Sequence, residues 1–259
     1  MPYKHLITEI NDRFVGTIVL NRPEQLNTFN SLLAGELTAA FKAMDADSKV
    51  RVVLLKGSGK AFCAGIDVNE LENKSAMEYR AWVEHMEQPL LTIAKMKKPV
   101  IAQVQGVAVA NGMGLVAAAD VAIAAENTKM GLTAINVGLN CVGPIIPLAR
   151  CVGRKKALEL LLYGDLIKAP QAQAFGILNR IVPKEELDAE ALAWAEKLAQ
   201  KSPIAVQIAK QAFYSSEDMD YFRQFDLMNE AFARLCTTMD AKEGVQAFLE
   251  KREPVWEER

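Results

Sequence analysis

The sequence has few of the features that mark disulfide-bonded, metal-dependent or membrane-spanning proteins. It holds only four cysteines and two histidines in 259 residues, and no two cysteines form a C-x-x-C pair. This argues against structural zinc, any other bound metal and a disulfide framework, and it predicts a reducing, cytoplasmic setting. Apolar runs stop well short of the about 18 residues that a membrane-spanning helix needs, and the N-terminal residues lack a signal-peptide pattern.

The chain also lacks a strong excess of either charge. Its formal net charge of -2 offers no broad attraction for nucleic acid or an anionic membrane. The cluster of Lys95, Lys97 and Lys98 is more typical of a solvated helix end than of an RNA-binding site. A hydrophobic share of 51% is enough for a substantial core. We therefore expect a globular protein without polynucleotide or membrane partners.

Apolar periodicity predicts several strands in the first half of the chain. Residues 6–10 and 15–20 flank a polar turn and indicate a hairpin. Nearly continuous apolar runs at 50–55, 100–104 and 121–125 are typical of strands buried on both faces. Such strands, separated by helices, favour an α/β core that contains parallel strands.

Helical spacing predicts helices between these strands and beyond them. The first three predicted helices cover residues 31–44, 77–96 and 112–119. Ser31 is a candidate cap for the first of them. After about residue 153 helical periodicity dominates, in stretches at 158–162, 189–198, 204–213, 221–235 and 245–249. We expect a core over residues 1–190 and a helical C-terminal region over residues 191–259.

A first small-residue loop follows the strand predicted at 50–55. It reads Gly57-Ser-Gly-Lys-Ala-Phe-Cys-Ala-Gly-Ile-Asp67, and Asp67 and Glu70 have the spacing of a capping box, which predicts a helix start. Free N–H groups at a helix start can stabilise negative charge on a ligand oxygen. A P-loop is excluded, because Leu54 holds its first glycine position and alanine follows Lys60. Alone, the loop is better explained as a glycine turn with an ordinary cap.

A second segment repeats this pattern after the strand predicted at 100–104. It reads Gln105-Gly-Val-Ala-Val-Ala-Asn-Gly-Met-Gly-Leu115 and leads through a small-residue turn into a helix. Its glycines alone are weak evidence, since close strand-to-helix packing explains them. A dinucleotide-binding fingerprint is excluded, because Ala117 holds its third glycine position. The two segments in one chain are far more specific than either one.

Together the two segments resemble the crotonase superfamily, the enoyl-CoA hydratase/isomerase family. The resemblance extends to Asp120 and to residues 153–160, 174–183 and 247–252, and so covers almost the whole chain. It implies an α/β fold, a spiral of ββα units with a helical C-terminal region used for trimerisation, as a homotrimer or a dimer of trimers. It also implies an acyl-CoA thioester as partner, with coenzyme A as part of the substrate and no permanently bound cofactor.

The resemblance further implies an oxyanion hole made by the backbone N–H groups of Ile66 and Asn111. Such donors stabilise the enolate-like charge that builds on a thioester oxygen. Glycine is commoner at position 111 in the family, but the donor is the main chain and is therefore kept. Substrate contacts carried over from the family involve Arg22, Gln25, Leu26, Lys60, Ala61, Ala64, Ile66, Asp67, Val68, Asn111, Phe248 and Lys251.

The side chains that move protons in this family are missing. Its hydratases use two glutamates, and the matching positions here are Gly114 and Ala134. Its isomerases and hydroxycinnamoyl-CoA hydratase-lyases use only the second. Where dienoyl-CoA isomerases and the chlorobenzoyl-CoA dehalogenase place an aspartate, this chain has Cys141 and Val142. Hydration by the two-glutamate route is not expected, because neither glycine nor alanine can transfer a proton.

Two explanations of the missing glutamates stay open. Ala134 replaces a native glutamate in an inactivated variant, or the protein naturally uses another polar group. Candidates for such a group are Asn136, Asn140, Cys141 and Glu70. The leading hypothesis is an enzyme for double-bond chemistry on acyl-CoA, and the alternative is a CoA-ester binding protein without efficient catalysis.

The acyl group is expected to lie against residues 73–88. Tyr79, Trp82 and Met86 can supply apolar surface to its pocket, although such side chains more often pack in a core. Cys141 is also expected to pack, since no histidine is placed in the sequence to activate its thiol.

Overall fold

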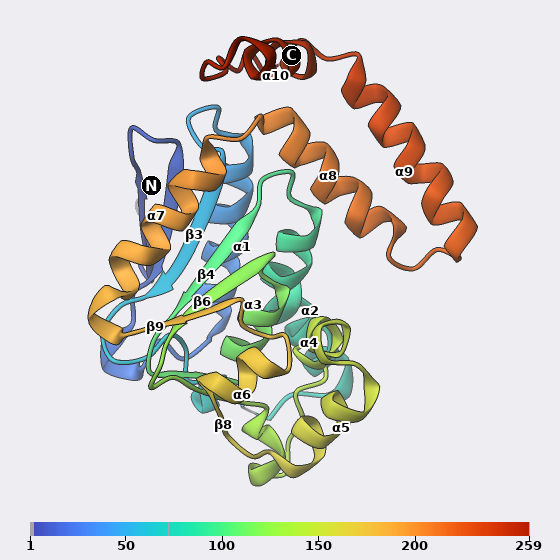
Figure 1. Ribbon diagram of the computed structural model, residues 1–259. Helices are drawn as coiled ribbons and strands as arrows, with labels where there is room; N and C mark the ends of the chain where they lie inside the picture. Colours follow the sequence, from blue (N-terminus) through green and yellow to red (C-terminus); the bar gives the residue numbers. More distant parts are fainter. Residues whose placement is uncertain (1–2, 72, 259) are drawn as a thin grey trace.

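The computed structural model describes residues 3–71 and 73–258 (Figure 1). Its main sheet has six strands in the order β1-β2-β3-β4-β6-β9. The strands are β1 (Leu6–Ile10), β2 (Val15–Leu20), β3 (Val52–Gly57), β4 (Val100–Val104), β6 (Val121–Ala125) and β9 (Arg180–Val182). β1 and β2 form the predicted antiparallel hairpin, and every other neighbouring pair is parallel. The predicted α/β class with parallel strands is confirmed.

A second sheet of three short strands was not predicted. Its order is β5-β7-β8, formed by β5 (Val107–Val109), β7 (Lys129–Gly131) and β8 (Ile167–Lys168). Strands of two or three residues are too short to show an alternation of apolar and polar side chains. They nevertheless matter, because β5 lies within the second small-residue segment.

Helices cover both faces of the main sheet (Figure 1). One face carries α1 (Ser31–Ala46), α2 (Ala76–Lys95) and α3 (Asn111–Ala118), and the other carries α7 (Leu187–Ala199). In β3, Val53 and Leu55 belong to the first core, whereas Val52 and Leu54 belong to the core under α7. Because successive strand side chains point to opposite faces, a sheet covered on both sides requires the continuous apolar runs seen in the sequence.

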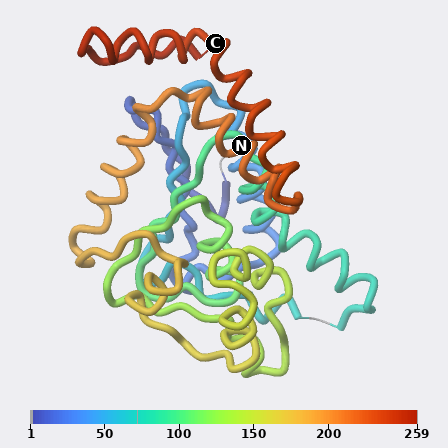
Figure 2. The backbone as a smooth tube through the Cα atoms, turned by 45° about the vertical axis from the view of Figure 1, so that its right-hand side comes forward, coloured from blue at the N-terminus to red at the C-terminus, as the bar shows by residue number. Residues whose placement is uncertain are grey.

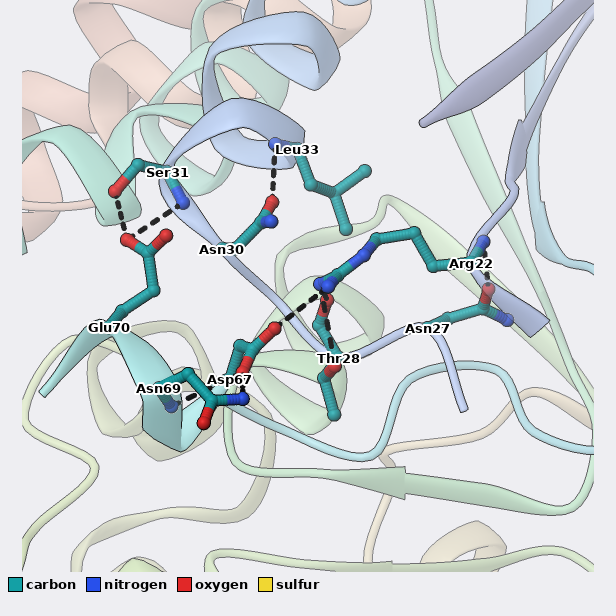
Figure 3. Close-up of polar contacts among 9 residues, drawn as sticks. All are labelled: Arg22, Asn27, Thr28, Asn30, Ser31, Leu33, Asp67, Asn69 and Glu70. Carbon is teal, nitrogen blue, oxygen red and sulfur yellow. Dashed lines mark hydrogen bonds and ion pairs between the residues drawn. The ribbon is translucent and has the colours of Figure 1, made fainter. Parts of the chain in front are cut away.

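Two local expectations about helix starts are wrong. Asn30, rather than Ser31, caps α1, since its side chain accepts an N–H of the first turn at 2.9 Å. The capping box of Asp67 and Glu70 does not form. Asp67 caps only a single 3-10 turn, η2 (Val68–Glu70), and the Glu70 carboxylate accepts the N–H and the hydroxyl of Ser31 instead (Figure 3).

From about residue 145 onward the chain is largely helical, as predicted, with β8 and β9 as its only strands among the described residues. Besides α7, this part contains α4 (Ile145–Val152), α5 (Arg154–Tyr163), α6 (Ala169–Ala174), α8 (Pro203–Ser216), α9 (Tyr221–Cys236) and α10 (Met239–Glu250). α8 and α9 pack against each other, and α10 continues beyond them at the edge of the molecule (Figure 2). Within the described residues, no helix combines the length and the hydropathy needed to cross a membrane.

Buried charge anchors α8 to the sheet. The Lys210 ammonium donates to the Asp120 carboxylate at 2.7 Å and to the carbonyl of Lys98 at 3.0 Å. Asp120 also accepts the N–H of Val100, the first residue of β4, at 2.7 Å. Lys98 is 6% exposed, and its ammonium donates to main-chain carbonyls. The expectation that all three lysines of its cluster are solvated is therefore wrong.

Candidate active site

The two segments singled out in the sequence lie side by side after the carboxyl ends of β3 and β4. Cys63 pairs with Ala108 in a parallel bridge, and the N–H of Val109 donates to the Cys63 carbonyl at 3.0 Å. Ile66 and Asn111 stand three residues further along their respective segments. The pairing of β5 with the first segment therefore brings the two expected donors into adjacent positions.

Glycines permit this close approach. A Cβ atom at position 112 would lie 2.4 Å from the carbonyl oxygen of Cys63, so only glycine fits there without a shift. Gly65 has a φ of +91°, and a Cβ there would lie 3.1 Å from the Cβ of Ala110. The glycines of the two segments are thus explained by main-chain packing around Ile66 and Asn111.

Gly112→Ala is expected to destabilise the fold by about 1–3 kcal/mol, because the added methyl group must displace the main chain at Cys63. Gly35→Ala, inside α1, is the matched control. The Cβ of the alanine would make an ordinary contact of 3.4 Å with His85 of α2. That substitution is expected to stabilise by about 0.5–1 kcal/mol through helix propensity. Urea unfolding measures both, and equal stability of Gly112→Ala and the wild type would contradict the packing argument.

The N–H groups of Ile66 and Asn111 are available to a ligand. The Ile66 N–H has no acceptor among residues 3–71 and 73–258, although the N–H groups of Ala64 and Asp67 both do. Asn111 begins α3, where an N–H has no partner within the helix, and Ala110 provides no side-chain cap. Ala110 has φ 48° and ψ −113°, a strained conformation of the kind found at functional sites.

The burial and the dipole of α3 strengthen any hydrogen bond that these N–H groups donate to a negatively charged oxygen. Every residue of α3 is buried, so its N-terminal N–H groups act in a region of low dielectric. The helix dipole adds partial positive charge at the same end. An oxygen that gains negative charge beside Ile66 and Asn111 would therefore be stabilised.

Comparison with known proteins identifies the family of this chain. The model of the enoyl-CoA hydratase/isomerase family matches residues 11–259. The chain belongs to this family. It is 38% identical to a probable enoyl-CoA hydratase of Rhizobium meliloti over 100% of both chains. It is also 35% identical to human enoyl-CoA hydratase domain-containing protein 3, mitochondrial, covering 93% of this chain and 80% of that protein. The structure of enoyl-CoA hydratase from Mycobacterium smegmatis superimposes with a TM-score of 0.94 at 37% identity, covering 99% of each chain.

In this family member, Arg22 and Asp67 are brought together as an ion pair with a distance of 2.8 Å between Nη2 and Oδ2 (Figure 3). Their side chains are only 11% and 12% exposed. The hydrogen bond from Arg22 is the main cause that lowers the pKa of Asp67. Arg22 also donates to the carbonyl of Thr28. Both side chains hold two loops together, and their contact with coenzyme A stays a prediction.

The other residues expected to contact the substrate fall into two groups. Most follow β2 or β3, where Ala61 is buried, Ala64 and Ile66 are half-buried, and the exposed members are Gln25, Leu26, Lys60 and Val68. Phe248 and Lys251 lie on and after α10, apart from the others. Residues after α10 reach the opposite end of β3, where Glu258 pairs with Arg51 at 2.8 Å. Within one chain, the structure does not bring Phe248 and Lys251 to the site.

Asn27 supports the site and was missed in the sequence. It is fully buried, accepts the N–H of Arg22 at 2.8 Å and donates to the carbonyls of Ser58 and Ala61 at 2.9 and 2.8 Å. It therefore joins the loop after β2 to the loop after β3. Its φ of 55° is one that asparagine tolerates better than most residues, which is the signal a turn analysis could have used.

The two positions of the family's glutamates differ in the space around them. A Cβ at Gly114 would lie 2.9 Å from the Cβ of Pro144 and 3.1 Å from its Cα, so Pro144 closes this position. Ala134 lies in the 3-10 helix η3 (Thr133–Val137), half-buried against the core. A longer side chain is therefore more easily placed at position 134 than at position 114.

The polar candidates named from the sequence are mostly engaged elsewhere. Asn136 donates to the carbonyl of Gly164 at 3.1 Å, while Asn140 is exposed. Cys141 is 4% exposed, and burial raises the pKa of its thiol, as expected of a packing residue. Glu70 accepts from Ser31 and, at 3.1 Å, from the Nε1 of Trp82. Although burial favours a higher pKa for Glu70, these hydrogen bonds lower it.

The residues expected to wall the acyl pocket have structural tasks as well. Met86 is buried in the core. Trp82 donates a hydrogen bond from Nε1 to the Glu70 carboxylate, and its ring packs edge-on against that of Tyr79 with 6.1 Å between the ring centroids. In the part of the chain that the structure describes, no group of three or more metal-ligating side chains is placed to hold a metal ion.

Proposed function

We propose that this family member binds an acyl-CoA thioester and holds its carbonyl oxygen between the main-chain N–H groups of Ile66 and Asn111. The observation that carries the proposal is the presence of two unpaired donors at adjacent positions of two paired segments. One donor also stands at the N-terminus of a fully buried helix. Preorganised donors of this kind stabilise an enolate more than a neutral carbonyl. The names of the relatives as enoyl-CoA hydratases support acyl-CoA as the substrate class.

The proposed chemistry is isomerisation or another enolate reaction rather than efficient hydration. Gly114 and Ala134 cannot transfer protons, and Pro144 closes the first of these positions. The second candidate function is a CoA-ester binding protein without efficient catalysis. The engagement of Asn136 and Glu70 with other groups favours this alternative, because it leaves neither of them free to act on a substrate.

The experiment measures binding of crotonyl-CoA and of a 3-enoyl-CoA by calorimetry, together with turnover of both. The proposal predicts binding of both esters and faster conversion of the 3-enoyl-CoA than hydration of crotonyl-CoA. Tight binding without turnover of either ester would favour the binding protein. Failure to bind either ester would contradict the proposed function.

We also propose that the chain forms a homotrimer or a dimer of trimers, with contacts supplied by the region over residues 191–259. Large apolar side chains on α9 and α10 are exposed in the single chain, among them Phe222 at 78%, Phe232 at 66% and Phe248 at 81%. Surface patches of this kind commonly mark protein interfaces. Such an assembly would allow Phe248 and Lys251 to reach the site of another copy.

Sedimentation is expected to give a mass of about three or six times the 28.5 kDa chain. Phe222→Asp should shift the protein to smaller species, because a charged side chain is costly to bury in an interface. Glu190→Gln, an exposed change on α7, is the control and should leave the mass unchanged. A wild-type monomer at all concentrations would contradict the proposed assembly.

A reducing, cytoplasmic setting belongs to the same proposal. Cys63 and Cys141 are buried free thiols in the first core. Burial raises the pKa of the Cys63 thiol to about 12, so this side chain acts as an apolar packing group.

A further inference from the structure

A half-buried carboxylate outside the family's glutamate positions reaches the loop between η3 and α4. It belongs to Glu87 on α2. A Cβ at Gly143 would lie 2.0 Å from the Oε1 of Glu87 and 2.4 Å from its Cδ. Gly143 does not have a left-handed φ that would require glycine, so the missing side chain serves to admit this carboxylate.

The same loop lies between Glu87 and the candidate active site. Gly143 is followed by Pro144, which packs on Gly114, and Gly114 lies one turn into α3 from Asn111. Glu87, on α2, therefore contacts the loop of Gly143 and Pro144. This loop covers Gly114, the position of the family's first glutamate. Glu87 and Gly143 also line a cavity of about 990 Å³ between α2–α4 and the pair of α8 and α9.

The Glu87 carboxylate differs from two acidic side chains near it, because it forms no hydrogen bond or ion pair with any residue that the structure describes. By contrast, Glu84 pairs with Arg80 at 3.0 Å, and Asp120 pairs with Lys210 at 2.7 Å. Burial, with a smaller contribution from the charge of Glu84, raises the pKa of Glu87. The charged or titratable groups that share its cavity are Lys95, Asp120, Arg150, Cys151, Tyr214, Glu217, Asp218, Glu230 and Arg234.

We propose that Glu87 moves the proton in this chain, in place of the two missing glutamates. The proposal rests on the proposed function, because it needs an acyl-CoA whose oxygen is held at Ile66 and Asn111. With a 3-enoyl-CoA, the Cα–H bond breaks, its electron pair enters a dienolate, and the proton moves to the Glu87 carboxylate. Glu87 then returns the proton to Cγ as the Cα=Cβ bond forms, and is ionised again. One carboxylate completes this cycle, whereas hydration also requires a group that activates water.

The test compares Glu87→Gln with Glu84→Gln, an exposed change one helical turn away on α2. Isomerisation of a 3-enoyl-CoA and exchange of its α-protons with deuterated water measure proton transfer, and calorimetry measures binding of the same ester. Glu87→Gln is expected to lower both rates by about a hundredfold or more without weakening binding. Glu84→Gln should keep the wild-type rates at a pH above the pKa of Glu87, because the charge of Glu84 contributes only to raising that pKa.

The pH dependence separates proton transfer from a structural role. The ionised carboxylate is the base, so the wild-type rate should rise as pH passes through the raised pKa of Glu87. This rise should persist in Glu87→Asp, at a lower rate, and disappear in Glu87→Gln. A wild-type rate in Glu87→Gln would overturn the role of Glu87 and leave the proposed function standing. Binding by the wild type without any proton exchange would overturn the role of Glu87 and favour the CoA-ester binding protein without efficient catalysis. Failure of the wild type to bind the ester would overturn both.

Discussion

Asn111→Pro is expected to lower turnover of a bound acyl-CoA by about a hundredfold to a thousandfold, because it removes one of two donors to the thioester oxygen. The first position of a helix tolerates proline, since its N–H makes no bond within the helix. Asn111 occupies this position in α3. Proline also restricts the preceding Ala110, which is already strained, so a loss of turnover is assigned to the missing donor only where thermal unfolding shows an intact fold.

Asn111→Gly is the matched control for this experiment. It removes the side chain and keeps the main-chain N–H, so turnover should stay close to that of the wild type. If the glycine variant lost as much activity as the proline variant, the side chain rather than the main chain would be the important group. Equal activity of Asn111→Pro and the wild type, with intact folding, would contradict a role for this donor.

Ala134→Glu is expected to raise turnover of an enoyl-CoA about tenfold or more, since it returns a carboxylate to a position that hydratases and isomerases of the family use. Ala134 is only half-buried, so a longer side chain at this position does not have to be fully buried. Gly114→Glu is the paired variant. It should give no gain and should lower the melting temperature, because Pro144 occupies the space beside position 114.

The two variants also separate the two explanations of the missing glutamates. A large gain in Ala134→Glu supports the view that a carboxylate has been lost from an otherwise intact site. An unchanged rate of enoyl-CoA turnover with intact binding would count against it and would favour natural use of another group. Stopped-flow absorbance of the enoyl thioester follows the reaction directly.

The long elements of the fold could be predicted because their side-chain patterns are local. Residues 31–44 show helical spacing, and α1 begins at the same residue. The apolar run at 100–104 corresponds to β4 because a strand covered on both faces needs apolar residues throughout. β5, with only three residues, has no such pattern. Its existence depends on pairing with residues far away in the sequence, such as Lys129 to Gly131 in β7.

The site could be predicted in part, for the same reason. The small-residue segments around Ile66 and Asn111 are recognisable because close main-chain packing demands glycine at defined positions. The approach of Glu87 to Gly143 and the cover of Pro144 over Gly114 involve residues distant in the sequence, so no spacing rule reveals them. The absence of free carboxylates at positions 114 and 134 was visible in the sequence. The carboxylate that we propose in their place, Glu87, becomes visible only in three dimensions.

The most direct test of the central claim is a crystal structure with a non-reacting acyl-CoA thioester bound. We expect the thioester oxygen to lie about 2.7–3.1 Å from the main-chain nitrogens of both Ile66 and Asn111, as in a working oxyanion hole. A bound ester whose oxygen points away from these two nitrogens, or contacts neither of them, would contradict the account.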